Sequence, residues 1–335
     1  MPKLKAAVIG LGVGEKHAEA LRNHPEVELV GLCDSDPRKM AEVSARFQGV
    51  PTSPDAETFL GDPDIDLVSI ASYDEFHATQ ILRGLEMKKH LFVEKPICLT
   101  LKEAQQITKA LRENPKLKIG SNLILRKYPL FVQLKKWVSE GRFGEIYAVE
   151  MDYNYGRLHK VSSGWRSQTP NYSITLSGGV HMVDLMLWIL GGKPERVFAH
   201  GNKVCSRGTS LHAPDFVSSL LDWGEVRVKL GMNFGCVQPH HHHVKVFGTE
   251  ATFIHDVTKT VIIDSRDPEA DFEEVDIPYP GCHKGDLLSE FVDSAILGQE
   301  ASPGRKEILD GLAICLAVDN SVRTHQSLEI PYLIS

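Results

Sequence analysis

The sequence predicts an α/β protein in which a doubly wound parallel sheet is followed by a second domain with a large, open, mostly antiparallel sheet. Three observations predict this fold. A glycine-rich turn at residues 10–14 joins a strand to a helix, strands and helices alternate up to residue 122, and consecutive strands follow. Since 335 residues exceed most single domains, we expect one domain at 1–122 and a second at 123–335.

The first 122 residues alternate between short apolar runs and amphipathic segments. The apolar runs predict strands at 4–9, 27–33, 66–71, 91–93 and 118–121. The segments between them predict helices at 17–23, 75–87 and 100–112, with a further helix opening at Asp36-Pro37. Proline is favourable in a first helical turn, and Thr100 with Glu103 has the spacing of a capping box.

The remainder of the chain has fewer helices and many alternating segments. Helices are expected at 129–140, 181–190 and 306–322. Strands are expected at 146–155, 196–201, 216–221, 226–233, 243–247, 252–255 and 260–263. Strands in this number, mostly consecutive, predict an open sheet with helices on one face.

Composition and charge exclude several classes of function. The hydrophobic fraction of 42% and charged fraction of 24% are those of a globular protein, and the net charge of −7 argues against nucleic acid as a partner. No apolar run approaches a membrane span, and the first residues lead directly into a strand, so we expect no membrane segment and no signal peptide. Six scattered cysteines without a CxxC pair indicate a cytoplasmic location.

The turn at residues 10–14 has the context that dinucleotide binding requires, between a strand and a helix. Gly10 would make the tight turn, and Gly12 would let backbone N–H groups reach a pyrophosphate at the helix N-terminus. The third glycine of the usual pattern falls on Glu15, with Gly14 one place early. We assign Gly10, Gly12, Val13 and Gly14 to cofactor binding.

Asp34, at the end of the second strand, indicates which dinucleotide is bound. Its carboxylate can accept both ribose hydroxyls of NAD and would repel the 2′-phosphate of NADP. Arg38 and Lys39 compensate in part, so NAD is favoured and NADP less so. The alternative is that Asp34 is a surface acid preceding a helix.

Glu94-Lys95-Pro96 follows the strand at 91–93. Alone, this tripeptide is typical of a solvated turn. Here the strand places Lys95 at the carboxyl edge of the sheet, where ligands bind in open α/β folds, and Pro96 keeps the preceding residue extended. The pattern indicates a catalytic lysine beside a dinucleotide.

A second group of chemically active residues lies in the later part of the chain. His181 and Asp184 share one face of a helix that opens after Gly178-Gly179, where a side chain can approach a ligand unobstructed. Three aromatic side chains and a guanidinium group precede them in the chain. Such groups suit a polyhydroxylated, sugar-like substrate, and the residues are Tyr153, Tyr155, Trp165 and Arg166. The alternatives are a structural histidine and, for the tyrosines and Trp165, packing within the sheet.

Four consecutive histidines, His240 to His243, cannot converge on one metal because neighbours on a strand point to opposite faces. We interpret them as a strand entry with one or two rings lining the pocket. Since no HExxH or Cys-His ligand set appears, we expect no metal site.

Together these motifs resemble the Gfo/Idh/MocA family, named for glucose–fructose oxidoreductase and inositol dehydrogenase. The resemblance covers essentially the whole chain. It rests on Ala-Val-Ile-Gly-Leu-Gly with His17, on Asp34, Ile70-Ala-Ser-Tyr with His77, Val93-Glu-Lys-Pro, Gly-Gly-Val-His181-Met-Val-Asp184 and Val-Phe-Gly-Thr-Glu-Ala-Thr at 246–252.

The resemblance implies an N-terminal Rossmann dinucleotide-binding domain and a C-terminal domain that binds substrate and forms a homodimer or homotetramer through its sheet. It implies NAD(P)-dependent hydride transfer to or from a secondary alcohol of a sugar, cyclitol or nucleotide sugar. Lys95 would contact the substrate hydroxyl and nicotinamide ribose, and His181 would accept the proton. Arg126 and Asp184 would bind substrate. The cofactor would be lined by Ser72, Tyr73, His77, Glu94 and Asn122.

One departure stands out. Many sugar and inositol dehydrogenases of the family carry an aspartate four residues before the catalytic histidine, where this chain has Ser177. Either Asp184 or a tyrosine substitutes, or His181 is a weaker base, or the reaction differs. Two other functions stay open: an NAD-dependent glycosidase acting by transient oxidation, and a non-catalytic cofactor-binding regulator.

Overall fold

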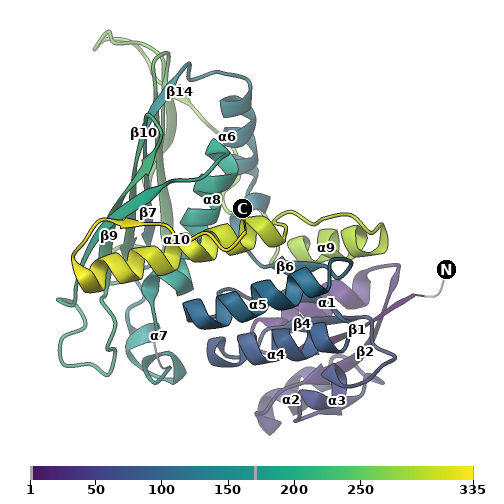
Figure 1. The fold of residues 1–335 in the computed structure, drawn as a ribbon. Helices are drawn as coiled ribbons and strands as arrows, with labels where there is room; N and C mark the ends of the chain where they lie inside the picture. The colour runs from purple at the N-terminus through teal and green to yellow at the C-terminus, as the bar shows by residue number, and fades with distance from the viewer. Residues whose placement is uncertain (1–2, 170–171, 335) are drawn as a thin grey trace. The chain divides into compact units, whose positions relative to one another are not determined.

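The structure is a computed structural model that describes residues 3–169 and 172–334. Its contacts divide the chain into two units (Figure 1). Unit 1 comprises residues 1–124, 282–309 and 333–335, and unit 2 comprises 125–281 and 310–332. A single boundary at residue 122 therefore leaves out the segment at 282–309, which returns to the first unit.

Unit 1 contains the expected parallel sheet, with strand order β3-β2-β1-β4-β5-β6. The strands are β1 (Leu4–Ile9), β2 (Val27–Cys33), β3 (Thr52–Ser53), β4 (Leu67–Ile70), β5 (His90–Val93) and β6 (Ile119–Ser121). The helices are α1 (Gly14–Asn23), α2 (Pro37–Ser44), α3 (Glu57–Leu60), α4 (Asp74–Glu86), α5 (Leu101–Glu113) and α9 (Asp286–Ile296). The capping box of Thr100 and Glu103 is confirmed. All neighbouring strands pair in parallel, so their carboxyl ends share one edge.

Helix α9 explains why the late segment belongs to unit 1. Its buried side chains join the core cluster that also contains Leu11, Leu21 and Phe92. The ring centroids of Phe291 and Phe92 are 5.6 Å apart. The sequence analysis ended the first domain at residue 122 and did not include this helix, because the residues that it packs against lie far away in the chain.

Unit 2 is a nine-stranded sheet of order β14-β13-β12-β11-β7-β10-β9-β8-β15. The strands are β7 (Ile146–Asn154), β8 (Arg196–Asn202), β9 (Phe216–Trp223), β10 (Val226–Asn233), β11 (His241–Gly248), β12 (Thr252–His255), β13 (Thr260–Ile263), β14 (Glu273–Glu274) and β15 (Leu328–Glu329). The expected open, mostly antiparallel sheet is confirmed; β7 and β10 pair in parallel. Strand β11 begins at His241, two residues before the expected start.

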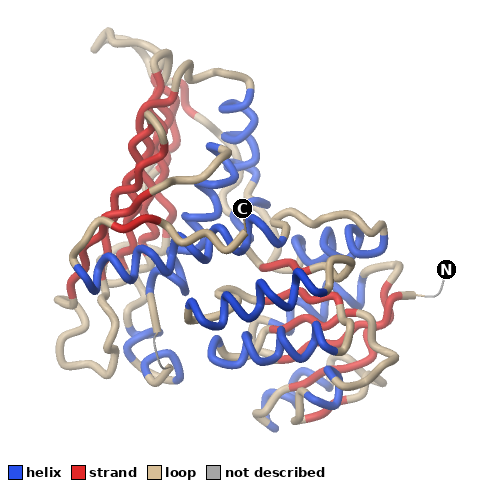
Figure 2. The backbone as a smooth tube through the Cα atoms, viewed as in Figure 1, coloured by secondary structure: helices blue, strands red, loops and turns tan. Residues whose placement is uncertain are grey.

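Helices cover one face of the unit 2 sheet, as Figure 2 shows. They are α6 (Pro129–Ser139), α8 (Val180–Leu190) and the later part of α10 (Arg305–Thr324). Short turns are η1 (Ile124–Lys127), α7 (His159–Ser162), η2 (Trp165–Ser167) and the π-helical η3 (Thr175–Gly179). Within the described part of the chain, no helix has both the length and the apolar character to cross a membrane.

Candidate functional site

The glycine turn after β1 leaves its backbone open. Gly10 has a φ of +86°, and a Cβ there would lie 2.3 Å from the carbonyl oxygen of Ala71. A Cβ at Gly12 would meet nothing within 4 Å, so no other part of the unit covers the turn there. Val13 caps α1 without a side-chain hydrogen bond. The first N–H groups of α1 thus have no side-chain cap, which is the arrangement that binds phosphate in dinucleotide folds.

Asp34 ties the end of β2 to this turn. Its Oδ2 accepts a hydrogen bond from the Leu11 N–H at 2.7 Å, and its Oδ1 accepts one from the Asp36 N–H at 2.9 Å. A carboxylate has about four acceptor positions, so two remain for ribose hydroxyls. Lys39, which was expected to offset this charge, instead pairs with Glu15 at 3.2 Å.

Glu94 is the centre of a buried network at the carboxyl ends of β5 and β6. Its Oε1 accepts a hydrogen bond from Asn122 Nδ2 at 2.7 Å and lies 3.4 Å from His17 Nε2. Its Oε2 accepts the Lys95 backbone N–H at 3.2 Å. Burial alone would raise the pKa of Glu94, but His17, Lys95 and Asn122 outweigh it and hold the pKa well below its usual value.

The network also fixes His17, to which the sequence analysis assigned no role. His17, on the buried face of α1, bonds Ser69 Oγ through Nδ1 at 2.8 Å. Asn122 Oδ1 is buried and has no partner among the described residues. The signal for His17 was its place among the buried positions Ala18 and Leu21, a pattern that alone indicates only packing.

Three other predicted cofactor residues lie at the β4–α4 turn. The Tyr73 side chain is exposed, and Ser72 Oγ donates to Gln80 Oε1 at 2.7 Å. His77 is fully buried, with Nδ1 2.7 Å from the Pro96 carbonyl oxygen and Nε2 3.0 Å from the Ser72 carbonyl oxygen. His77 therefore links this turn to the Glu-Lys-Pro segment, and its direct contact with a cofactor stays a prediction.

These observations fit a dinucleotide. The open turn at Gly12 and the α1 N-terminus suit a pyrophosphate, Asp34 has spare acceptor positions for a ribose, and the Asn122 Oδ1 is an orphaned acceptor on the same edge of the sheet.

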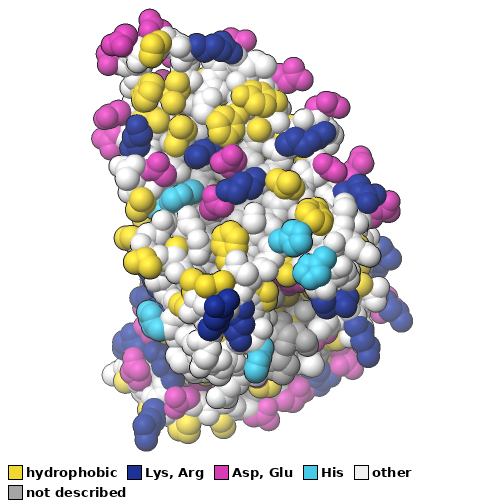
Figure 3. Space-filling view, turned by 90° about the vertical axis from the view of Figure 1, so that its left-hand side faces the viewer, with side chains coloured by type: hydrophobic (Ala, Val, Ile, Leu, Met, Phe, Trp, Pro, Cys, Tyr) yellow, Lys and Arg dark blue, Asp and Glu magenta, His cyan; other side chains and the backbone are white. Residues whose placement is uncertain are grey.

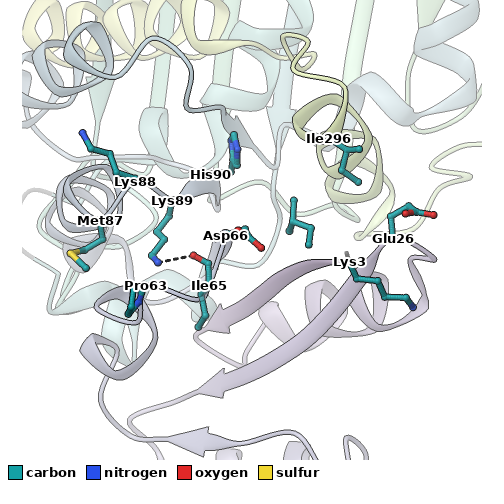
Figure 4. Close-up of a pocket in the computed structure, with 11 residues that line it drawn as sticks. Lys3, Glu26, Pro63, Ile65, Asp66, Met87, Lys88, Lys89, His90 and Ile296 are labelled. Carbon is teal, nitrogen blue, oxygen red and sulfur yellow. Dashed lines mark hydrogen bonds between the residues drawn. The ribbon is translucent and has the colours of Figure 1, made fainter. Parts of the chain in front are cut away.

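A pocket of about 490 Å³ lies at the opposite, amino-terminal edge of the parallel sheet (Figure 4). Leu4, Asp66 and His90 line it at the starts of β1, β4 and β5. The Lys89 ammonium group is turned into the protein, where it donates to the Asp62 and Ile65 carbonyl oxygens. This pocket is therefore distinct from the edge that carries Asp34 and Lys95.

In unit 2, His181 lies in the first turn of α8 and is nearly buried. The two glycines before it, Gly178 and Gly179, pack closely against the sheet, and the approach of a ligand to His181 stays a prediction. A Cβ at Gly178 would lie 2.6 Å from Tyr153 Cε1, and one at Gly179 would lie 2.8 Å from Met232 Cγ. The glycines let η3 and α8 approach β7 and β10 closely enough for the Tyr153 ring to stack on His181, with centroids 6.2 Å apart.

Ser177, at the place of the expected aspartate, has a tyrosine partner. Its Oγ lies 2.9 Å from the Tyr172 hydroxyl oxygen. The pair consists of two hydroxyl groups and supplies no carboxylate, so it cannot stabilise an imidazolium as an aspartate would. The sequence pattern gave no signal for Tyr172.

Arg126 and Asp184 contact each other. Arg126 Nε donates to Asp184 Oδ2 at 2.9 Å, and Arg126 Nη2 donates to Asp184 Oδ1 at 2.6 Å. Both side chains are almost fully buried, at 3% and 2% exposure. The bidentate pair links η1 to α8 and thereby orients the helix that carries His181. Direct substrate binding by either residue stays a prediction.

Aromatic side chains gather at the carboxyl ends of β7 and β10. The Tyr153 ring lies 5.1 Å from the His240 ring and 5.2 Å from the His242 ring. Burial lowers the pKa of His240 to about 4 and that of His242 well below its usual value, so both are neutral at pH 7. Two of the four histidines thus join the predicted substrate side, as alternation along a strand requires. Trp165 and Arg166 form a separate cation–π pair, in which the Arg166 Cζ lies 4.4 Å from the Trp165 ring centroid.

Comparisons with known proteins identify the family. Residues 4–120 match the oxidoreductase family with an NAD-binding Rossmann fold, and residues 131–254 match the GFO/IDH/MocA C-terminal domain. The chain belongs to this family of NAD(P)-dependent dehydrogenases that act on CH–OH groups, and unit 1 is its NAD-binding domain.

Two similar proteins are inositol 2-dehydrogenases. The one from Acidothermus cellulolyticus is 25% identical over 332 residues, which cover 97% of this chain and 93% of that protein. The one from Salmonella typhimurium is 27% identical over 217 residues, 64% of this chain and 62% of that protein.

Similar solved structures share the fold across the whole chain. A putative NADPH-dependent oxidoreductase from Desulfitobacterium hafniense has a TM-score of 0.82 at 25% identity and full coverage of both chains. Levoglucosan dehydrogenase in complex with NADH has a TM-score of 0.85 at 19% identity, covering 98% of this chain and 99% of that one. The second likeness, at this identity, concerns the fold alone.

Proposed function

We propose that this protein oxidises a secondary alcohol of a sugar or cyclitol with NAD as hydride acceptor, with Lys95 and His181 as catalytic residues. The observation that carries the proposal is the Glu94 network. It holds the backbone of Lys95 at the edge of the sheet that also carries the open glycine turn and Asp34. The names of the similar inositol and levoglucosan dehydrogenases support a polyol substrate.

The chain's own residues supply the acid–base part of the reaction. His181 would remove the hydroxyl proton, and the Lys95 ammonium group would stabilise the negative charge that develops on the oxygen. A positioned acid–base group contributes about 10²–10⁴-fold in rate. Asp34 favours NAD over NADP because its charge would repel a 2′-phosphate.

The test is the absorbance of NADH during incubation with a panel of sugars, cyclitols and nucleotide sugars. Lys95→Met and His181→Asn should each lower kcat by about 10²-fold or more. Exposed residues on the same units provide matched controls: Lys102→Met and His212→Asn should turn over like the wild type. Full turnover by Lys95→Met or His181→Asn would overturn the assignment.

We also propose that two or four copies of this chain associate through the open face of the unit 2 sheet. Figure 3 shows hydrophobic side chains among charges of both signs on this side of the molecule. Leu220 and Phe198 oppose each other on β9 and β8 and are 60% and 38% exposed. Light scattering on the wild type and on Leu220→Lys tests this: the variant should dissociate, and a monomeric wild type would overturn the proposal.

We propose a cytoplasmic location because the cysteines are unpaired. All six are free thiols, and Cys33, Cys98 and Cys315 are buried. Thiol titration of protein isolated from its native cells would show six reactive groups after unfolding, and any disulfide would contradict this location.

A further inference from the structure

Arg157 is a guanidinium group without a counter-charge at the end of the aromatic cluster described above. Its side chain is exposed, and no carboxylate of the described residues lies within ion-pair distance of it. Some arginines of unit 2 have such partners, since Arg126 pairs with Asp184, Arg142 with Glu273 and Arg196 with Glu329. Arg166 and Arg227 have no carboxylate partner among the described residues either, and Arg157 differs from them in its contact with Tyr155 of the aromatic cluster. An unpaired arginine beside a candidate substrate site is a candidate for anion recognition.

The backbone before Arg157 is held firmly. The Tyr155 N–H donates to the Asn233 carbonyl oxygen at 2.8 Å. Gly156 has a φ of +59°, and a Cβ there would lie 2.0 Å from the Gln238 carbonyl oxygen. Only glycine permits this approach, so the position of Arg157 is set by contacts between the ends of β7, β10 and β11.

Arg157 continues a row of rings that begins at His181. Tyr153 stacks on His181 with centroids 6.2 Å apart, and Tyr155 stacks on Tyr153 with centroids 6.0 Å apart. The Arg157 Cζ lies 5.7 Å from the Tyr155 ring centroid. Phe234 and His240 flank Tyr155, and their ring centroids lie 4.8 Å and 5.4 Å from the Tyr155 centroid. All these residues belong to unit 2.

The chemistry of this row matches a sugar that carries a negative group. Aromatic faces contact the C–H faces of a sugar ring, and a guanidinium binds carboxylate or phosphate oxygens through two parallel hydrogen bonds. The imidazole of His240 is neutral at pH 7, so it contributes no charge of its own beside Arg157. Its Nε2 is buried and has no hydrogen-bond partner among the described residues.

We infer that Arg157 binds an anionic group of the substrate, so that the site takes carboxylated or phosphorylated sugars in preference to neutral polyols. The inference rests on the proposed function, since it assigns a substrate class to that same site. Carboxylate and phosphate share the recognition chemistry, and a nucleotide sugar offers it through its diphosphate.

The experiment measures binding separately from turnover. The full-length protein saturated with NADH is titrated calorimetrically with D-glucose, D-glucuronate, glucose 6-phosphate and UDP-glucose. Wild type should bind at least one anionic ligand about tenfold or more tightly than glucose, because a charge-assisted pair supplies that much. The preference should shrink as salt is added, since Arg157 is exposed.

Arg157→Gln should reduce the ratio of anionic to neutral affinity to near one. Arg227→Gln is the matched control, since Arg227 is an exposed arginine of the same unit at the opposite end of β10, and it should keep the wild-type ratio. The anionic ligand with the largest loss identifies the source of the charge. Equal wild-type affinity for glucose and every anionic ligand, or an unchanged ratio in Arg157→Gln, would overturn the inference. Binding of a ligand that yields no NADH when NAD replaces NADH would instead count against the proposed function.

Discussion

The Arg126–Asp184 pair gives a quantitative prediction. Asp184→Asn removes a bidentate carboxylate from a nearly buried guanidinium; the two side chains are only 3% and 2% exposed. Removing one partner of such a buried pair costs about 3–5 kcal/mol of unfolding free energy. Replacing both residues, as Arg126→Met with Asp184→Leu, should recover most of this loss since both charges of the pair are then absent.

The assay is equilibrium unfolding in urea, followed by circular dichroism and repeated for a control variant. Asp152→Asn breaks the more exposed pair between Lys229 and Asp152, 3.3 Å apart, and should cost at most about 1 kcal/mol. An Asp184→Asn protein within about 0.5 kcal/mol of wild type would refute the reasoning. A rise in KM without a loss of stability would favour the predicted role of Asp184 as a substrate ligand.

Single substitutions at three other residues give further predictions. Asp34→Ser should weaken NAD binding by about 10-fold or more and reduce discrimination against NADP, measured by fluorescence titration of both cofactors; unchanged discrimination would contradict this. Gly178→Ala should cost about 1–3 kcal/mol by displacing Tyr153, measured by urea unfolding, and a neutral effect would contradict the packing role. Burial lowers the pKa of His255 to about 3, so its contribution to stability is complete above pH 6.5 and is lost as pH falls toward 3. His255→Phe should therefore flatten the unfolding free energy between pH 6.5 and 4, whereas a curve parallel to wild type would contradict the assignment.

Local signals predicted most of the fold. Strand β1 (Leu4–Ile9) has the expected bounds, and α5 starts at the capping box that its sequence contains. Helix α9 was missed because its apolar face packs on Leu11 and Phe92, which are distant in sequence. The parallel pairing of β7 with β10 and the π-helical turn η3 depend on long-range packing and not on local periodicity.

The candidate site likewise contains residues that the sequence indicated and contacts that it did not. Gly10, Asp34 and the Glu-Lys-Pro segment have a local pattern, so the sequence indicated their region and chemistry. The pairing of Arg126 with Asp184 joins residues 58 positions apart and was not foreseen. The stacking of Tyr153 on His181 likewise required the contact between η3 and the sheet.

The most direct test of the central claim is a turnover assay at 340 nm with NAD and a panel of neutral and anionic sugars and cyclitols. The proposed dehydrogenase predicts one NADH formed per molecule of ketone product, with loss of activity in Lys95→Met. Product formation with no net NADH would contradict a dehydrogenase and favour a glycosidase that recycles its cofactor. No turnover on any member of the panel, despite NAD binding, would favour a non-catalytic regulator.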